Sequence, residues 1–580
     1  MASIFFQTLM FLFFCSTWVV SFFAALISCE NVYRAVCVSS VLWSAFLFAL
    51  TEGLNLFKSI TAANLIISWA IFLIIFIFYC LSKRNLLIYK IKSLKQSFAS
   101  LYKDNGNSVK AMIVFIAFFM FVRTVLAVMT TPYNYDSIAY HLARIMYWIQ
   151  HKSVDYYETA EIRQLFSPVF AEYINLHVFL LTGGDLFANM LQNFSAYGCI
   201  FLLYGIIRKL GCNIKYALFG CILTLSMNIF CAESLSTQVD LVGTFYLMIL
   251  TYLMIEILYQ SKLTFFQFML LGLVSGLIYI TKTNACIPAA LIVLYVVSVR
   301  IFHKDFKIIP LGFVSLIFVF LIVFTTFYRN YSALNGDFIA NTNIGGVVIG
   351  TSSPKYVFAN VIKNLITAGF ERNNELIKGG MTVLEKILKI DINAPEISFI
   401  ATPFSVKYSL HMDLAGAHIV TPLFLIAAVI FPIYLIRHRT RINGLIFIML
   451  AQMFVMLALL RWQPWGSRLL ISSLVIAVIP IVYIFKEITD SFKKNSLKYK
   501  ICYFLILELI FQCGICSSES FLFHSSVALN AMRSPRYARY WANSQTQRRV
   551  ACDNFLRIID EGIYNTIGLE GTYQYPFLAR

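Results

Sequence analysis

A long apolar run of this chain ends at the stretch Thr130-Thr-Pro-Tyr-Asn-Tyr-Asp136-Ser-Ile-Ala-Tyr-His141-Leu-Ala-Arg144-Ile-Met-Tyr-Trp148, where charged and aromatic residues take over. A helix drawn through this stretch at about 100° per residue gathers its polar side chains in one sector and its apolar side chains in the opposite one. The polar sector holds Asp136, Tyr140, Arg144, Tyr147 and His151. The pattern predicts an amphipathic helix lying in a membrane interface, with its polar face turned toward water. Asp136 is therefore the first candidate for an active-site residue.

The composition of the whole chain is that of a membrane protein. Its 580 residues are 59% hydrophobic and 13% charged, and the mean hydropathy is +0.76, whereas soluble domains are only about 45–50% apolar. Runs of roughly 20 apolar residues, enough to cross a hydrocarbon core of about 30 Å, recur along the sequence. We expect an all-α, polytopic transmembrane bundle of about 13–14 spans. The basic residues that give the net charge of +18 lie between these apolar runs, where they set the membrane topology. We therefore expect no nucleic-acid binding.

The apolar runs and the basic turns between them give a topology. Spans are expected near residues 3–28, 35–54, 62–81, 111–130, 187–207, 215–231, 241–259, 264–280, 286–301, 308–327, 418–436, 443–460, 468–485 and 500–517. The segment from Lys83 to Lys110 holds seven basic residues and one acid, which places it in the cytoplasm by the positive-inside rule. Alternation then puts Asp136 on the extracytoplasmic side and the remaining basic turns on the cytoplasmic side.

The same topology divides the chain into five parts. Residues 1–110 hold extra N-terminal spans and the basic cytoplasmic segment, and residues 111–327 hold a membrane core with a first outer loop at 131–185. Residues 328–417 form a second outer loop, 418–517 the last spans, and 518–580 an extracytoplasmic tail. Single charges such as Asp240 and Lys282 lie at outer span ends. Ionisable groups at such depths are costly unless they pair or line a polar cavity.

These features together resemble the GT-C membrane glycosyltransferases, and more narrowly the family 39 group of protein O-mannosyltransferases and aminoarabinose transferases, in a bacterial branch with uncharacterised acceptors. The resemblance covers about residues 111–485. It is carried by the segments Tyr135-Asp136-Ser-Ile-Ala-Tyr140-His141-Leu-Ala-Arg144, Arg163-Gln164 with Pro168, Thr237-Gln-Val-Asp240-Leu and Trp462-Gln-Pro-Trp465-Gly-Ser-Arg468. The sequence departs from the family in two ways: three spans precede the one that feeds the catalytic loop, and Ser137 stands where a second adjacent acid is usual.

The resemblance implies a donor sugar carried on a polyprenyl phosphate and transferred with inversion on the periplasmic face of the inner membrane. The implied partners are this lipid-linked sugar, membrane lipids, and a glycan, lipid or protein acceptor. Asp136 would be the general base that takes the proton of the incoming hydroxyl. A second catalytic acid would be Asp240, then Glu172, then Glu161. Metal dependence stays open, and no residue is assigned as a metal ligand.

Basic side chains would hold the leaving phosphate, because cations stabilise the charge that grows as the bond to the sugar breaks. Lys282, Arg329 and Arg468 are the candidates, and Tyr140, His141, Arg144, Arg163 and Glu172 would complete the substrate site. The two catalytic candidates and the three cations also have structural explanations. Asp136 is also a suitable helix N-cap, Asp240 is a suitable cap of its own span, and the three cations could be interfacial anchors. We expect His141, which lies off the polar sector, to hydrogen-bond behind the site.

Two other classes of function compete with the transferase. A transporter or lipid flippase would carry a central polar path, usually with matched halves and helices broken near the midplane, whereas here the charges lie at one end of the spans. An inactive scaffold that binds a lipid-linked sugar would keep the cations and have no use for Asp136. The phenylalanine-rich spans, with 54 Phe in the chain, fit packing and lipid contact, and they also fit the wall of an isoprenoid groove.

Overall fold

The computed structural model describes residues 3–333, 344–371, 374–493, 496–534, 536–541, 550, 553–557 and 574–578. Parts of the predicted outer loop at 328–417 and of the predicted tail at 518–580 lie outside these residues.

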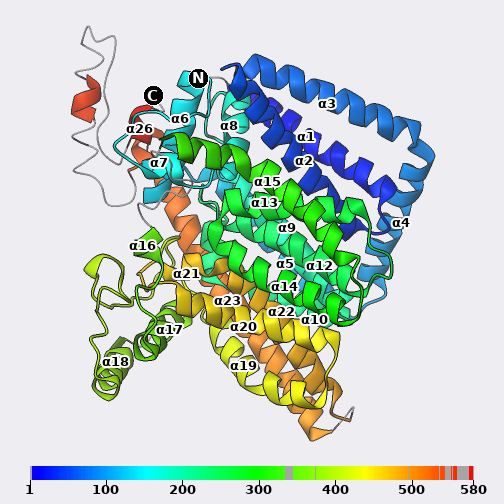
Figure 1. Cartoon of the computed structure of the whole chain (residues 1–580), viewed down its shortest axis with the longest axis vertical. Helices are drawn as coiled ribbons and strands as arrows, with labels where there is room; N and C mark the ends of the chain where they lie inside the picture. Colours follow the sequence, from blue (N-terminus) through cyan, green and yellow to red (C-terminus); the bar gives the residue numbers. More distant parts are fainter. Residues whose placement is uncertain are drawn as a thin grey trace.

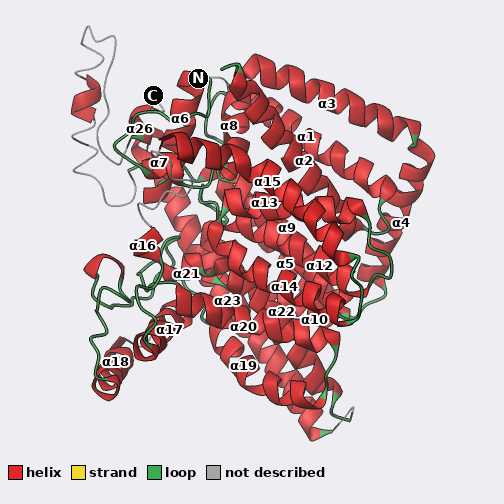
Figure 2. Ribbon diagram, viewed as in Figure 1, coloured by secondary structure: helices red, strands yellow, loops and turns green. Residues whose placement is uncertain are grey.

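The described residues are helical apart from loops, turns and two isolated bridges, Val348 with Leu460 and Ser398 with Trp462 (Figure 2). Eleven of the described helices are long and apolar enough to cross a membrane, and three more apolar helices are shorter. These helices fall at the fourteen predicted spans. The predicted all-α, polytopic fold is confirmed.

The first half of the chain contains α1 (Ile4–Ser28), α2 (Val32–Leu56), α3 (Ala62–Ser82), α4 (Arg84–Lys103), α5 (Asn107–Met129), η1 (Ser137–His141), α6 (Leu142–His151), α7 (Arg163–Phe166), α8 (Phe170–Thr182), α9 (Met190–Lys209), α10 (Ile214–Leu225), α11 (Asn228–Glu233), α12 (Asp240–Tyr259), α13 (Phe265–Thr281) and η2 (Thr283–Ala285). The second half contains α14 (Cys286–Phe302), α15 (Ile308–Ala333), α16 (Ile344–Val347), α17 (Pro354–Gly369), α18 (Asn374–Leu388), η3 (Phe399–Ala401), α19 (Val420–Arg437), α20 (Arg441–Leu459), α21 (Gly466–Leu469), α22 (Ile471–Asp490), α23 (Leu497–Met532), α24 (Arg536–Arg539) and α26 (Tyr575–Leu578).

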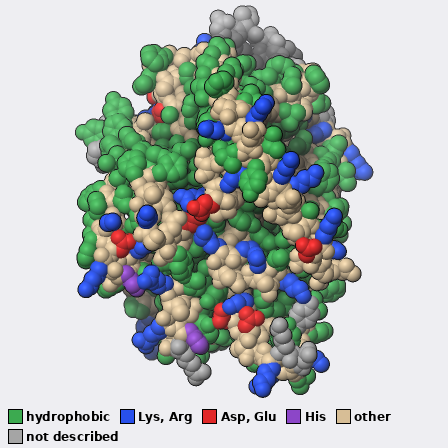
Figure 3. Space-filling view, turned by 90° about the vertical axis from the view of Figure 1, so that its right-hand side faces the viewer, with side chains coloured by type: hydrophobic (Ala, Val, Ile, Leu, Met, Phe, Trp, Pro, Cys, Tyr) green, Lys and Arg blue, Asp and Glu red, His purple; other side chains and the backbone are tan. Residues whose placement is uncertain are grey.

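The bundle has two chemically different ends. The short helices α6, α7, α16, α21 and α26 gather at one end in Figure 1, together with α17 and α18, while α4 lies at the opposite end. Figure 3 looks onto the end that carries α4, where Lys and Arg side chains are scattered over the surface among few acids. The predicted cytoplasmic loop is largely α4 itself, an exposed helix with no buried residue. We call this the basic end and the opposite one the outer end.

The centre of the bundle is α12, whose residues are buried along almost its whole length. It packs against α9, α13, α14 and α22. Because α12 begins at Asp240, this carboxylate lies at the outer end of the most enclosed helix. A charge at that depth requires partners, which the surrounding helices supply.

The three N-terminal spans pack onto the outer-loop helix α8 through aromatic and polar contacts. Trp69 donates its indole N–H to His177 Nδ1 at 3.1 Å, and Thr51 lies 3.0 Å from the other ring nitrogen of His177. Glu52 of α2 pairs with Arg329 of α15. The extra helices are thus part of the packed core.

The last span is longer than predicted, because α23 continues without a break through Met532. The tail beyond it packs on the outer end where the structure describes it. Asp185 accepts hydrogen bonds from Arg536 at 2.6 Å, Tyr540 at 2.7 Å and Tyr575 at 2.9 Å. The last described segment, α26, also packs against α6 and η1.

Candidate active site

Asp136 directly precedes η1 in helical backbone conformation, and its residue is 8% exposed. It makes no side-chain capping bond. Asn134 accepts the backbone N–H of Ser137 instead, at 3.2 Å. The N-cap alternative for Asp136 is therefore wrong, and its carboxylate is directed to other side chains.

Three donors surround the Asp136 carboxylate. Arg468 Nη2 lies 2.8 Å from Oδ2, Arg163 Nη1 lies 3.2 Å from Oδ1, and the Gln238 amide donates to Oδ2 at 3.3 Å. These residues come from three separate outer segments of the sequence. The fold therefore brings Asp136 together with Arg163 and Arg468, two of the predicted site residues.

Burial by itself would raise the pKa of Asp136, because a charged carboxylate loses its hydration. Arg468, His141 and Arg163 act in the opposite direction, and the outcome is a pKa lowered to about 2. Asp136 is therefore ionised at neutral pH. Its ion pairs stabilise the fold above the unfolded pKa of about 3.9, and this stability is lost as the pH falls toward 2.

Arg468 is the shared cation of the site. Its Nη1 lies 3.1 Å from Asp413 Oδ1 while Nη2 contacts Asp136. Burial lowers the pKa of this guanidinium, but Asp136, Asp240, Asp413 and Glu233 raise it well above its usual value. Arg468 thus contacts two carboxylates directly, and the charges of two more carboxyl groups act on it. Burial raises the pKa of Asp413, and the nearby charge of Asp136 raises it further. Arg468 lowers it, but the pKa of Asp413 stays above its usual value.

Asp240 and Lys282 form the second ion pair, 2.9 Å between Nζ and Oδ1. Asp240 begins α12 and Lys282 ends α13, which packs beside it. Gly243 makes this approach possible, because a Cβ there would lie 2.6 Å from Lys282 Cβ. The second oxygen of Asp240 is buried with no hydrogen-bond partner among the described residues. Both predicted residues therefore lie beside the Arg468 cluster.

The helix after Asp136 begins with one π-helical turn, in which Leu142 donates its N–H to Ser137 O. This turn takes up one more residue than an α-turn, so the side chains that follow are rotated away from a continuous α-helical wheel. Arg144 does not lie beside Asp136, as the wheel predicted, and that prediction is wrong. Its guanidinium donates to the carbonyls of Arg163 at 2.8 Å and Pro168 at 3.1 Å, and it lies 3.5 Å from Glu172.

The π-turn brings His141 into the polar network instead. His141 Nδ1 lies 2.7 Å from Glu172 Oε1, and Nε2 lies 3.3 Å from Gln238 Oε1. Both ring nitrogens thus face side-chain oxygen atoms. Burial raises the pKa of Glu172, but Arg144 and His141 lower it below its usual value. A hydrogen-bonded chain runs from Glu172 through His141 and Gln238 to Asp136.

Arg163 forms the exposed side of the cluster, with 32% of its side chain accessible. Glu161 holds its guanidinium through two contacts of 2.8 Å. The same guanidinium lies over the rings of Tyr135 and Tyr140, 5.2 Å and 4.9 Å from their centres. Tyr140 is buried and Tyr135 is 37% exposed. The Asp136 site therefore opens to the surface beside Arg163 and Tyr135.

Arg329 is not brought to this cluster. It pairs with Glu52 and lies 3.1 Å from the Tyr173 hydroxyl, between α2, α8 and α15. Its charge is matched by Glu52 of α2, which lies outside residues 111–485, the part of the chain that carries the GT-C resemblance. The predicted grouping of Arg329 with Lys282 and Arg468 is corrected on this ground.

The Arg468 segment is held in place by α17 of the second outer loop. Asn360 accepts the Trp462 N–H at 3.0 Å, and Asn364 donates to Leu460 O at 2.7 Å. Thr367 accepts the Trp462 indole N–H at 2.8 Å. The three α17 residues are spaced i, i+4 and i+7, so they lie on one helix face. This polar stripe could have been found in the sequence.

Lys363 on the same helix is buried among neutral acceptors. Its Nζ donates to Ile392 O at 2.7 Å and Ser398 Oγ at 2.6 Å, and lies 4.8 Å from the centre of the Trp462 ring. Burial lowers the pKa of Lys363 to about 7, against a smaller opposing effect of Asp391. The outer loop therefore contains a lysine that loses its proton near neutral pH.

We expect the outer loop around α17 to become more stable as the pH rises from 6 to 9. In this range the unfolded loop binds the Lys363 proton, with a pKa of about 10.4, while the folded loop releases it, so stability increases with pH. Hydrogen exchange of residues 354–369, corrected for intrinsic rates, measures the change. Lys363→Met should remove the dependence. Equal protection of the wild type at both pH values would contradict the assignment.

Three residues of the cluster were not singled out from the sequence. Gln238 lies inside a quoted motif, and Glu233 is an acid within an apolar segment, a pattern that points to function in membrane proteins. Asp413 has no such local pattern. Among the described residues, no three His, Cys, Asp or Glu side chains are grouped in a way that could hold a metal ion.

Comparison with known proteins gives a likeness in fold only. No protein-family model matches the chain, and no curated protein matches it significantly. Two solved structures of ArnT from Cupriavidus metallidurans are similar in helical arrangement. The structure bound to undecaprenyl phosphate has 11% identity and a TM-score of 0.47, and covers 80% of this chain and 84% of its own. The apo structure has 12% identity and a TM-score of 0.48, with 82% and 85% covered.

Proposed function

We propose that the protein is an integral membrane glycosyltransferase of the GT-C kind. It moves a sugar from a polyprenyl-phosphate donor to an acceptor at the outer end of the bundle, with inversion at the anomeric carbon. The observation that carries this proposal is the buried, ionised Asp136 held between Arg163 and Arg468. The quoted GT-C-like segments supply Asp136, Arg163, Asp240 and Arg468, and the fold gathers their side chains at the outer end.

In the proposed reaction the acceptor hydroxyl attacks the anomeric carbon from the side opposite the phosphate. The bond from that carbon to the phosphate oxygen breaks as the bond to the acceptor oxygen forms, and the hydroxyl proton passes to Asp136. The leaving polyprenyl phosphate carries the negative charge away. Arg468 and Lys282 stabilise that charge, as fixed cations do in a site shielded from water.

The low pKa of Asp136 belongs to the site without a donor, where Arg468 pairs with the carboxylate. A phosphate that binds Arg468 competes for the same guanidinium N–H groups. Its negative charge raises the pKa of a neighbouring carboxylate. Donor binding thus makes Asp136 a stronger base at the moment when a base is needed. Asp240, with one unpartnered oxygen among the described residues, is positioned to orient the acceptor or the sugar.

Native mass spectrometry of the protein gently extracted from its own membrane tests the donor. We expect a bound polyprenyl phosphate, free or glycosylated, which is lost in Arg468→Gln and Lys282→Gln. Arg461→Gln is the matched control, since Arg461 lies in the same outer segment but outside the ion-pair cluster. Phospholipid as the only bound lipid in the wild type, or a carrier that Arg468→Gln retains, would overturn the donor assignment.

A further inference from the structure

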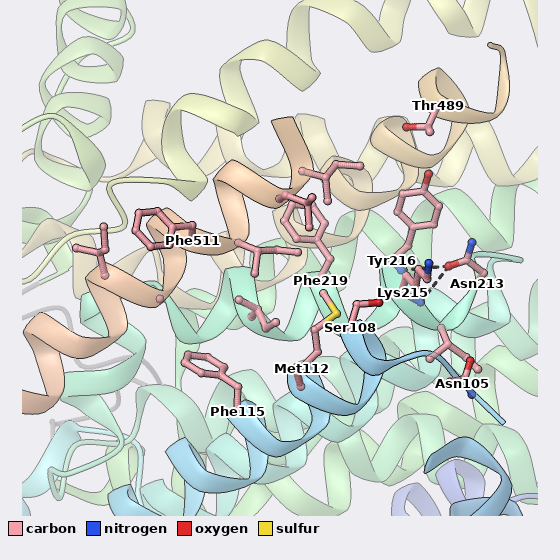
Figure 4. Close-up of a pocket in the computed structure, with 18 of the residues that line it drawn as sticks. Asn105, Ser108, Met112, Phe115, Asn213, Lys215, Tyr216, Phe219, Thr489 and Phe511 are labelled. Atoms are coloured by element: carbon pink, nitrogen blue, oxygen red, sulfur yellow. Dashed lines mark hydrogen bonds between the residues drawn. The ribbon is translucent and has the colours of Figure 1, made fainter. Parts of the chain in front are cut away.

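A cavity of about 980 Å³ lies between α5, α10 and α23, and its polar end lies at the first residues of α5 and α10. Its size is at the upper end of the roughly 300–1,000 Å³ range of ligand sites. Figure 4 shows two different halves. Phe115, Phe219 and Phe511 line one part, while Asn213, Lys215 and Thr489 gather at the other.

The polar half is the mouth of the cavity at the basic end. Arg208 at the end of α9 and Lys215 in the first turn of α10 both line it. Helices α5 and α10 begin there, with Asn105 and Ser108 on one side and Asn213 on the other. A helix N-terminus carries partial positive charge and favours anions. The Asn213 side chain already accepts the N–H groups of Lys215 and Tyr216, so the positive charge at this opening comes mainly from the two cations.

The other half is mostly apolar and lies beside exposed residues of α23. Phe511 is 64% exposed on α23, and Phe115 and Phe219 line the same cavity from α5 and α10. Gly514 leaves space there, since a Cβ at this position would meet no atom within 4 Å. The carboxylate among the lining residues is that of Glu519, and it comes from the part of α23 farthest from the mouth. The cavity is thus amphipathic, with cations at one end only.

We infer that this cavity binds an anionic phospholipid from the membrane leaflet at the basic end. The lipid phosphate lies at the mouth beside Lys215 and Arg208, and the acyl chains lie along Phe115, Phe219 and Phe511. Charge complementarity selects an anionic headgroup, since each basic residue near an anionic lipid surface adds attraction. This site is independent of the proposed sugar transfer.

The geometry separates this lipid from the proposed sugar donor. Helix α5 has 23 residues and spans roughly 35 Å at about 1.5 Å per residue. The mouth lies at its first residues and Asp136 follows its last. A phosphate at the mouth is therefore a membrane thickness away from Asp136.

Native mass spectrometry of delipidated protein, titrated with phosphatidylglycerol or phosphatidylcholine, tests the inference. We expect one phosphatidylglycerol to bind about tenfold more tightly than phosphatidylcholine, given one or two added charge contacts. Lys215→Glu should remove this preference. An acid in the first turn of α10 suits the helix dipole, so the variant is expected to fold. Lys262→Glu, the same change at an exposed residue that does not line the cavity, should keep the preference.

A second pair of variants tests the acyl half by filling space. Gly514→Phe should lower phosphatidylglycerol binding about tenfold, because its ring occupies the cavity. Gly312→Phe on α15 is the matched control, since a Cβ at Gly312 would also meet no atom within 4 Å. Equal affinities for the two lipids would overturn the inference. So would equal binding by the two phenylalanine variants, or a polyprenyl phosphate that Gly514→Phe displaces.

Discussion

Replacing Asp136 by asparagine is expected to lower the rate of sugar transfer by about 10²–10⁴-fold, the usual contribution of a general base. The amide has nearly the same shape as the carboxylate but cannot take the acceptor proton. Arg468 keeps its contact with Asp413, 3.1 Å away, so one partner of the buried cation remains. Donor binding should be kept or strengthened, because Asp136 no longer competes with the phosphate for Arg468.

The measurement is a single-turnover assay with saturating lipid-linked donor, alongside native mass spectrometry of the bound carrier. Glu375→Gln is the matched control, because it makes the same change at an exposed carboxylate of the outer loop. An Asp136→Asn enzyme that keeps more than about a tenth of the wild-type rate would exclude general-base catalysis by Asp136. Loss of carrier binding together with activity would instead assign Asp136 to the donor site.

Arg468→Gln is expected to have the second largest effect. Loss of one donor that stabilises the leaving charge costs about 10²–10³-fold in rate. The variant should also raise the pKa of Asp136, because burial then acts without the main opposing charge. At donor concentrations far below saturation, where the pH profile reports the free enzyme, the acid limb should therefore move to higher pH. The wild type should show no Asp136 titration above about pH 4 under the same conditions.

Transfer rates between pH 4.5 and 9 measure this shift. Arg468→Lys restores the charge without the planar, two-pronged geometry of a guanidinium. It should return the acid limb toward that of the wild type with only part of the rate. If Arg468→Gln lost rate with an unchanged pH profile, Arg468 would not control the pKa of Asp136. A size-exclusion profile equal to that of the wild type is required, because the change leaves Asp136 and Asp413 with fewer partners.

The spans could be predicted from the sequence because hydropathy is a local property of about 20 residues. The positions of α5, α9 and α12 follow from that pattern alone. The length of α23 could not be predicted in this way, because the helix continues beyond the apolar run and its outer part packs on α11.

The candidate site could be predicted only in part. Asp136, Arg163, Asp240, Lys282 and Arg468 were all placed at the outer end by topology, and the fold brings them together. Topology carries no information about which outer charges meet. Arg329 was grouped with them, yet Glu52 matches its charge elsewhere. Asp413 was missed because its position depends on how a long loop folds back over the bundle.

The π-turn Ser137–His141 begins the helix that follows Asp136. A change in direction near a membrane boundary usually needs a loop, and a loop leaves backbone N–H and C=O groups that must find other partners. Here the direction of the side chains changes inside a helix, in which Leu142 still donates its N–H to Ser137 O. Asp136 and Arg144 thus serve different neighbours from one uninterrupted element. Both side chains belong to one polar network, which is joined through His141 and Glu172.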